Sequence, residues 1–553
     1  VLDKLLQQKV ISQQVHNVAV ATPMSKELHP RQIPNGCATS YAPFFCDYVI
    51  QILRNDPAFG ATAADRQALL DRGGLTIRTT LDPALQHIAQ KAVDQAIPPK
   101  DPSRKIAAAV VEQPGTGAIL AMAQNRVWGT NTKVRGQTTI NYMVDQKYNG
   151  TDFGIAAGST FKAFTMAAAL EKHVSINTQI DATSPKTFTH FHNCTTGALY
   201  PPYSPTNSTT SGVMNMAKAA AYSVNTYFVA IEEKIGQCAP AALAAQLGIH
   251  DAQGRVVTDP GPSWTLGTYE TTPLDMAEAY ATFAARGLHC VSRAIVSVTD
   301  RTGAALRVPA RSCSQVISQP IADGVNYLLH GVITGPYPGS TGAPMALAGG
   351  RPAAGKTGTI DDHAAVWFVG YTPQLATAVT VTDQRSGFEH PLLNITINGV
   401  HYGEVFGKSI PGPIWKQIMD AALAGQPFEN FVPPDPKIIA GAQVRIPDLT
   451  NLSVSDAKKA LAAVGLTATV SKKWVNVDAI QYGHVASSSP PFGTSVGIGS
   501  EVTLFVSTGK APPGSQPTSS AGASGSPSAS PSSSPSSSSK PSSSAQPGGS
   551  SSP

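Results

Sequence analysis

The chain has 553 residues, enough for roughly three or four domains of ordinary size. Its hydrophobic fraction of 42% can support buried cores, whereas only 14% of its residues are charged and the formal net charge is +5. This small, dispersed charge gives no indication of a nucleic-acid partner, and no apolar run reaches the length of about 18 residues that a membrane-spanning helix needs.

The first part of the chain, residues 1–74, consists of short helical patterns separated by breaks that contain proline and glycine. We expect a connector here rather than a core. The chain opens within an amphipathic pattern formed by Val1, Leu5, Leu6 and Val10. We therefore expect an upstream part of the protein, which could hold a membrane anchor.

Three strands and a helix are predicted next. Residues 75–80 alternate and are rich in β-branched side chains, which predicts a strand. A helix follows from Pro83, because proline suits the first helical turn and apolar residues then recur at helical spacing. Residues 106–111 and 118–123 are apolar runs on either side of a glycine-containing turn, and we expect them to form a hairpin that opens the main domain.

A mostly apolar helix is predicted from Gly158 to about Leu170. Ser159 and Lys162 stand three residues apart and therefore share one helix face. Gly158 allows a sharp backbone turn before the serine. Burial would lower the pKa of the lysine and let it act as a base towards a nucleophilic serine. The alternative is a surface serine and lysine on an ordinary helix, and this pair alone is weak evidence.

The central part of the chain alternates between helices and loops. Residues 181–211 are rich in Thr, Pro and Asn, which predicts a long surface excursion. Short strands with turns are expected over 288–318. Helices are predicted over residues 214–221, 229–235, 241–247, 273–285, 321–332 and 411–423.

Two further polar motifs accompany these elements. Ser223-x-Asn225 follows the helix over 214–221, and Lys356-Thr357-Gly358-Thr359 precedes two apolar strands over 364–369 and 375–382. Taken alone, the first motif is equally typical of a helix cap or a turn. The second, alone, is equally typical of a hairpin turn with a solvated lysine.

The six cysteines are scattered, and none forms the C-x-x-C spacing of a zinc site, so we expect no metal. An even number of scattered cysteines fits an oxidising compartment. We predict pairing between cysteines that are close in sequence, with six buried free thiols as the alternative. The predicted pairs are Cys37–Cys46, Cys194–Cys238 and Cys290–Cys313.

The three polar motifs, in this order and at these separations, resemble those of class A penicillin-binding proteins. The resemblance is to the transpeptidase half, and it covers roughly residues 75–425. It includes flanking stretches such as LTIRTTLDPAL and LGTYETTPLDMAEAYATFAARG. It implies an α+β fold like that of serine β-lactamases, with an antiparallel sheet flanked by helices over residues 75–432. Ala157 and Ala163 stand where the family often has proline, but neither change removes a reacting group.

The resemblance also implies roles for the motif residues, and no cofactor. Ser159 would attack the carbonyl between two D-alanines of a peptidoglycan stem peptide, and Lys162 would accept its proton. Ser223 would relay a proton to the leaving amine, and Asn225 would bind the substrate amide. The last motif would bind the terminal carboxylate through Lys356, Thr357 and Thr359, while Gly358 lets the strand lie close to the substrate. The backbone N–H groups of Ser159 and Thr359 would form the oxyanion hole, and β-lactams would acylate Ser159.

The C-terminal part divides into a small unit and a tail. Residues 441–508 resemble a PASTA domain, a small α/β unit, through Ile-Pro-Asp-Leu at 446–449, a helix, and Ser-Pro-Pro-x-Gly at 489–493. This implies association with the cell wall and contact with muropeptides, the alternative being a passive spacer. Residues 509–553 are almost wholly Ser, Pro, Gly and Ala, which predicts disorder.

The function expected from these resemblances is a D,D-transpeptidase outside the cytoplasm, at the bacterial membrane and cell wall. We expect the parent protein to carry a membrane helix and a glycosyltransferase domain that this chain lacks. Two alternatives stay open. Water could replace the acceptor amine, giving a carboxypeptidase or β-lactamase, although no clear E-x-x-L-N element lies between Ser223 and Lys356. The chain could also be a non-catalytic module that binds or senses the wall.

Overall fold

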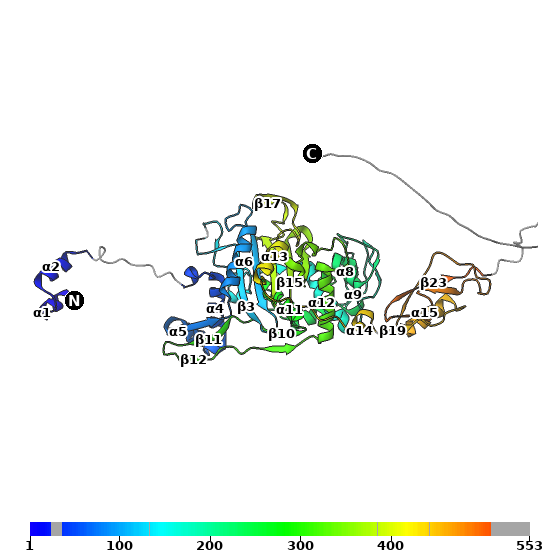
Figure 1. The fold of residues 1–553 in the computed structure, drawn as a ribbon, viewed down its shortest axis with the longest axis horizontal. Coiled ribbons are helices and arrows are strands. Elements are labelled where there is room, and N and C mark those ends of the chain that lie inside the picture. The colour runs from blue at the N-terminus through cyan, green and yellow to red at the C-terminus, as the bar shows by residue number, and fades with distance from the viewer. Residues whose placement is uncertain (24–35, 132, 384, 442, 510–553) are drawn as a thin grey trace, which may run out of the picture.

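The computed structural model describes residues 1–23, 36–131, 133–383, 385–441 and 443–509. Two N-terminal helices, a large central body and a small C-terminal body follow one another along the chain (Figure 1). Apart from Gly509, the predicted disordered tail lies outside the described residues. Within the described ranges, no helix combines the length and apolar character needed to cross a bilayer.

A five-stranded antiparallel sheet forms the centre of the large body, with the strand order β14-β15-β16-β2-β3. Strand β14 lies at its edge and pairs Lys356 with Val369 and Gly358 with Trp367. The strands are β2 (Lys105–Gln113), β3 (Ala118–Gln124), β14 (Ala354–Thr359), β15 (Ala365–Tyr371) and β16 (Ala376–Asp383).

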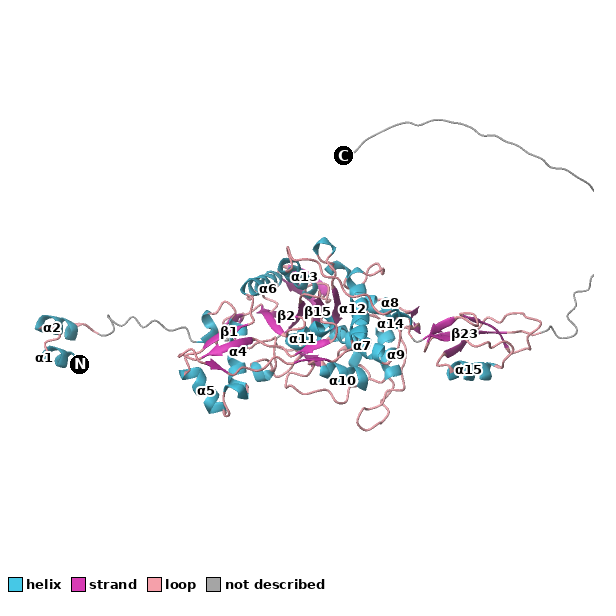
Figure 2. Cartoon of the chain, turned by 60° about the horizontal axis from the view of Figure 1, so that its bottom comes forward, coloured by secondary structure: helices cyan, strands magenta, loops and turns pink. Residues whose placement is uncertain are grey.

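Helices cover both faces of this sheet, which explains why its strands are apolar on both sides (Figure 2). Side chains alternate along a strand, so neighbours in β2 enter different cores. Ala107 and Ala109 belong to the cluster that includes α6 (Pro83–Ala96) and α13 (Pro411–Ala422). Ala108 and Val110 belong to the larger cluster on the other face. The helices of that cluster include α7 (Lys162–Glu171), α9 (Asn225–Ile235), α11 (Pro273–Ala284) and α12 (Gln319–Thr334).

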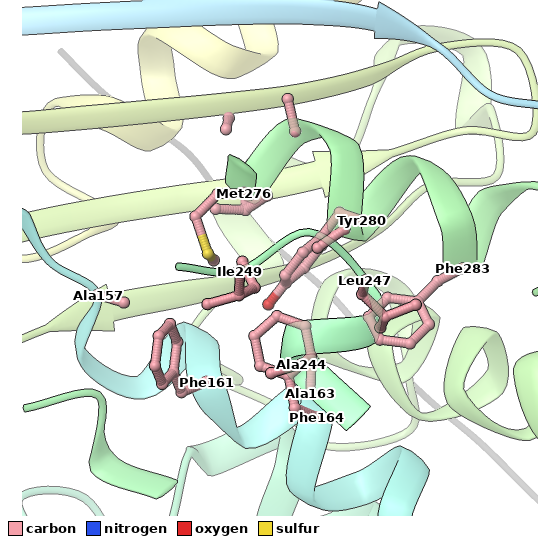
Figure 3. Packing of buried hydrophobic residues seen from close by; sticks show 14 of the residues in the cluster. Ala157, Phe161, Ala163, Phe164, Ala244, Leu247, Ile249, Met276, Tyr280 and Phe283 are labelled. Carbon is pink, nitrogen blue, oxygen red and sulfur yellow. The ribbon is translucent and has the colours of Figure 1, made fainter. Parts of the chain in front are cut away.

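Helix α7 lies at the middle of the larger core and follows a single 3-10 turn over Gly158–Phe161. Every residue from Lys162 to Leu170 is buried. The ring of Phe164 packs against Tyr280 and Phe283 of α11, and the ring of Phe161 packs against that of Phe164 (Figure 3). Because aromatic side chains bury large areas, they fix the start of this helix against α11.

The large body contains further helices and strands around this centre. Its other helices are α4 (Pro43–Asn55), α5 (Ala63–Arg72), α8 (Met216–Tyr222) and α10 (Cys238–Gln246). Its other strands are β1 (Thr76–Thr79), β4 (Val127–Trp128), β5 (Gln137–Thr138), β6 (Ile155–Ala156), β7 (Ile180–Asp181), β8 (Val213–Met214), β9 (Glu270–Thr271), β10 (Leu288–Cys290), β11 (Ile295–Thr299), β12 (Ala305–Leu306), β13 (Cys313–Gln315), β17 (Leu393–Ile397) and β18 (Val400–Glu404). The two detached N-terminal helices are α1 (Leu2–Gln7) and α2 (Gln13–Ala21).

The C-terminal body has a hydrophobic core of its own, which includes Leu449, Leu461 and Leu504. Helix α15 packs against a sheet of order β20-β23-β21, in which β20 and β23 are parallel. Helix α14 (Pro436–Ala440) leads into this body, and its Ile438 and Ile439 pack against the larger core of the large body. The elements of the C-terminal body are β19 (Gln443–Arg445), α15 (Val454–Ala463), β20 (Thr467–Val470), β21 (Val485–Ser489), β22 (Ser495–Gly497) and β23 (Glu501–Val506).

The predicted disulfide pairing is confirmed. The bonds are Cys37–Cys46, Cys194–Cys238 and Cys290–Cys313, and together they use all six cysteines. The second bond joins the 181–211 segment to the first residue of α10.

The expectation that residues before 75 form no core is wrong for α4. This helix buries Phe44, Phe45, Tyr48 and Leu53 in the larger core. The sequence PFFCDYVIQIL places apolar residues on one helical face, but the proline- and glycine-containing breaks around it favour a connector.

Replacing Leu53 by alanine tests the contribution of α4. Leu53 is 0% exposed, so Leu53→Ala should lower the free energy of unfolding of the large body by about 2–5 kcal/mol. Val18→Ala is the control, because Val18 of α2 is 62% exposed and its loss should change that free energy by less than about 0.5 kcal/mol. Chemical denaturation measures both, and equal stability of the two variants would mean that α4 is only a connector.

Candidate active site

Ser159 lies on a turn fixed by close backbone contacts between glycines. Gly158 has a φ of +60°, and its N–H donates to the carbonyl of Gly267 at 3.0 Å. A Cβ on Gly158 would stand 2.7 Å from the backbone nitrogen of Thr359, and one on Gly267 would stand 2.0 Å from the Gly158 carbonyl. Side chains at these positions would therefore push the serine away from the end of β14.

Lys162 Nζ lies within hydrogen-bonding distance of four oxygen atoms, which belong to Ser159, Ser223 and Asn225. The side chain is 0% exposed and occupies the first turn of α7. Its Nζ lies 2.9 Å from Ser159 Oγ, 2.7 Å from the Ser223 carbonyl, and 2.6 Å from Asn225 Oδ1. Ser223 Oγ is also near, at 3.3 Å. The first two sequence motifs therefore meet at one amine.

The third motif reaches the same point from the sheet edge. Lys356 Nζ donates to Ser223 Oγ at 2.7 Å and to the Thr357 carbonyl at 3.1 Å. Ser223 ends α8 in the left-handed conformation, with a φ of +55°, and this turn places its hydroxyl between the two lysines. The structure thus brings together all five residues expected to act in catalysis, Ser159, Lys162, Ser223, Asn225 and Lys356.

Burial shifts the pKa of both lysines downward, because a charged ammonium loses its hydration inside the protein. It lowers the pKa of Lys356 to about 7. It lowers the pKa of Lys162 well below the ordinary range, and the neighbouring Lys356 charge lowers it further while Asp361 opposes this. Lys162 can therefore be neutral near neutral pH, as a base must be.

The residues expected to hold a substrate carboxylate lie along β14 rather than in a hairpin turn. Thr357 is 8% exposed, and Thr359 ends the strand, where its Oγ1 accepts from the N–H of Gly407 at 3.4 Å. Gly358 is needed for a reason that the sequence did not reveal. A Cβ there would lie 2.6 Å from the carbonyl of Ala157, so the glycine lets the strand approach the nucleophile turn itself.

Several supporting residues escaped the sequence analysis. Tyr280 Oη donates to the Thr160 carbonyl at 2.8 Å, and Trp367 Nε1 donates to the Ala156 carbonyl at 2.8 Å. Both bonds anchor the backbone beside Ser159 to the core. Tyr280 lies in a stretch that resembles the family, but no residue pattern in the sequence predicts its bond to Thr160 or the bond of Trp367 to Ala156.

One group of side chains outside this site could hold a metal ion. Ligand atoms of Asp145, His250 and Asp275 lie within 4.8 Å of one another. Asp275 already caps α11 through Thr272, and His250 Nδ1 lies 3.5 Å and 3.4 Å from the two carboxylates. Ion pairing and helix capping therefore account for this cluster.

Comparison with known proteins places these motifs in a family. The model of the penicillin-binding protein transpeptidase domain matches residues 107–419, and that of the PASTA domain matches residues 444–508. A penicillin-binding protein 1A of Mycobacterium tuberculosis is 32% identical over 394 residues, which are 67% of this chain and 42% of that protein. A protein of the same name from Mycolicibacterium smegmatis is 31% identical over 398 residues, 67% of this chain and 44% of that protein. The chain thus spans less than half the length of these relatives.

Solved structures agree with this assignment. The penicillin-binding protein PonA1 from Mycobacterium tuberculosis in complex with penicillin V is 31% identical, with a TM-score of 0.55, covering 70% of this chain and 96% of that one. Penicillin-binding protein 1A from Haemophilus influenzae is 17% identical, with a TM-score of 0.58, covering 81% of this chain and 78% of that one, and it supports the fold alone. The three motifs and the matched domains show that this chain belongs to the penicillin-binding protein transpeptidase family and carries a C-terminal PASTA domain.

Proposed function

We propose that this chain is a serine D,D-transpeptidase that cross-links peptidoglycan stem peptides ending in D-Ala-D-Ala and is acylated by β-lactams. The observation that carries the proposal is the surroundings of Lys162. A neutral amine has two N–H donors and one lone pair. The Ser223 carbonyl and Asn225 Oδ1 can only accept, and they take the two donors at 2.7 Å and 2.6 Å. The lone pair is left for the hydroxyl of Ser159 at 2.9 Å.

In the first step, Ser159 Oγ forms a bond to the carbonyl carbon of the penultimate D-alanine while its proton passes to Lys162. The bond between this carbon and the nitrogen of the terminal D-alanine then breaks. The leaving amine takes a proton through Ser223, whose Oγ lies between Lys162 and Lys356. The products are free D-alanine and an acyl-serine.

Two sets of groups near Ser159 can bind negative charge on the substrate, one for its terminal carboxylate and one for the oxyanion. The Lys356 ammonium and the hydroxyls of Thr357 and Thr359 suit the terminal carboxylate. The backbone N–H groups of Ser159 and Thr359 suit the oxyanion, and such donors are worth about 3 kcal/mol each in comparable sites. The tight packing of Gly158 against Thr359 keeps these two N–H groups close together.

In the second step, an amine of another stem peptide attacks the acyl carbon and gives its proton to Lys162. The bond to Ser159 Oγ breaks, and the serine regains its proton. A carboxypeptidase would use water at this point instead, and product analysis with an acceptor amine distinguishes the two outcomes.

The wider setting is part of the same proposal. The transpeptidase domain would extend over residues 75–432 and act outside the cytoplasm, where three disulfides are stable. The PASTA domain over 441–508 would contact muropeptides of the wall, with the Ser/Pro-rich residues 509–553 as a flexible extension. The resemblance to class A proteins supports a membrane anchor and a glycosyltransferase activity in the whole protein.

Labelling with a fluorescent penicillin tests the nucleophile and its base. Ser159→Ala should abolish the covalent signal, because no other atom takes the place of Oγ. Lys162→Ala should slow acylation by about 10²–10⁴-fold, the usual contribution of a general base. Stopped-time labelling on gels measures both rates.

The matched control is Lys172→Ala, which removes an exposed lysine just after α7 and should leave the rate unchanged. Persistent labelling of Ser159→Ala would show that another nucleophile reacts. No labelling of the folded wild-type chain would refute the enzyme proposal and favour a wall-binding module.

The pH dependence of acylation should reflect both lysines. Acylation needs Lys162 neutral, so the rate should rise with pH through the lowered pKa of that group. Binding of a carboxylate needs Lys356 charged, so the second-order rate constant should fall above the pKa of about 7 given to Lys356 by burial. Measuring acylation from about pH 5 to about pH 10 should give a bell-shaped profile. A rate that keeps rising to the upper end would contradict the role of a charged Lys356.

The acceptor is tested with a stem-peptide substrate in the presence and absence of a second amine. We expect D-alanine release together with a cross-linked product when the amine is present, identified by mass spectrometry. Hydrolysis alone, unchanged by added amine, would make the chain a carboxypeptidase, since the acyl-serine would then react only with water.

A further inference from the structure

We propose that the 181–211 segment is a positioning element for acylation, in which the Thr206 carbonyl and the Asn207 side chain fix the orientation of the Asn225 amide. The inference rests on the proposed function and extends it to residues outside the three motifs. It starts from the first turn of α9, which begins at Asn225 and whose N-cap residue, Val224, makes no side-chain capping bond.

The missing cap is supplied by a residue 19 positions upstream in the sequence. Asn207 Oδ1 accepts from the N–H of Thr226 at 2.9 Å, and Asn207 Nδ2 donates to Thr226 Oγ1 at 2.9 Å and to the Ala182 carbonyl at 3.0 Å. The first N–H groups of a helix have no partner within it. Asn207 therefore caps the N-terminus of α9, a role that in most helices belongs to a Ser or Asp next to the first turn.

The neighbouring Thr206 acts on Asn225 directly. Its carbonyl accepts from Asn225 Nδ2 at 2.8 Å, and Asn225 Oδ1 accepts from Lys162 Nζ at 2.6 Å. A carbonyl can only accept, so it fixes which end of the amide is the nitrogen. The amide oxygen must then face Lys162.

This orientation determines what Lys162 can do. An inverted Asn225 amide would point N–H groups at Lys162 Nζ, and the amine would lose one of its two acceptors. One of its N–H groups would then turn towards Ser159, and its lone pair would no longer face the nucleophile. The Thr206 carbonyl therefore acts on the base through Asn225, so Thr206 and Asn207 are positioning residues.

The segment is held in place on several sides. The bond Cys194–Cys238 ties it to α10, and Asp259 accepts from Asn193 and from Tyr200 Oη. Its few apolar side chains pack on α9 around Val229. A segment fixed in this way can define the position of the α9 N-terminus rather than follow it.

The test is a double-mutant cycle on the acylation rate. Asn207→Ala should slow β-lactam acylation by about tenfold, because misplaced catalytic groups commonly cost this much or more. In an Asn225→Ala background the same change should have almost no further effect, because its target is gone. A merely structural loss would instead slow acylation by the same factor in both backgrounds.

Two further variants control the experiment. Asn207→Asp keeps the acceptor for the Thr226 N–H and should retain at least about half of the wild-type rate. Thr195→Ala removes an exposed side chain of the same segment, whose backbone N–H bonds Asn193 within the segment, and it should leave the rate unchanged. If Asn207→Ala does not fold, Asn207→Gln takes its place, with the same expected loss.

The outcomes separate this inference from the proposed function. Absence of wild-type labelling would refute the proposed function itself. Normal wild-type labelling, abolished by Ser159→Ala, with an unchanged rate in Asn207→Ala would overturn only the positioning role. Equal slowing in the wild-type and Asn225→Ala backgrounds would overturn it as well.

Discussion

Two buried lysines that share one serine hydroxyl dominate the energetics of this site. Lys162 and Lys356 are both 0% exposed, and Ser223 Oγ lies within hydrogen-bonding distance of each amine. In the described part of the chain, no carboxylate hydrogen-bonds either amine. Burying one unpaired ammonium costs several kcal/mol, and a second beside it adds repulsion. The site therefore favours a neutral Lys162, so that burial itself provides the base that a serine nucleophile requires.

Such a site works only if its atoms cannot drift apart, and backbone packing supplies this rigidity. Gly158 contacts both Gly267 and the end of β14, while Gly358 approaches Ala157 too closely for any side chain. Helix α7 is buried from Lys162 to Leu170, so the lysine cannot swing out to solvent. Close-packed backbone has few alternative arrangements, unlike long side chains on a surface. The nucleophile is thus placed by the sheet edge and the core together.

The pairing of Ser159 with Lys162 could be predicted from their spacing on one helix face, whereas the placement of Ser223, Asn225 and Lys356 beside them followed from the resemblance to penicillin-binding proteins. The sequence also predicted most helices and strands, since apolar periodicity follows directly from burial. It could not predict the contacts of Gly267 or Tyr280, which depend on tertiary approach between distant segments. For the same reason the sequence predicts only a connector where α4 lies, since the apolar face of this helix is explained only by the core that it covers.

The 181–211 segment shows how a correct structural prediction can miss a functional contribution. Its polar composition rightly indicated an excursion, because few of its side chains can be buried. Polar segments, however, are fixed in position by directed hydrogen bonds, and the same bonds can also orient groups of a neighbouring element. Asn207 closes the open end of α9 and Thr206 orients Asn225, at a point where the local sequence offers no cap. Where a catalytic residue lies on the first turn of a helix that lacks a local cap, the distant segment that caps the helix therefore also positions that residue.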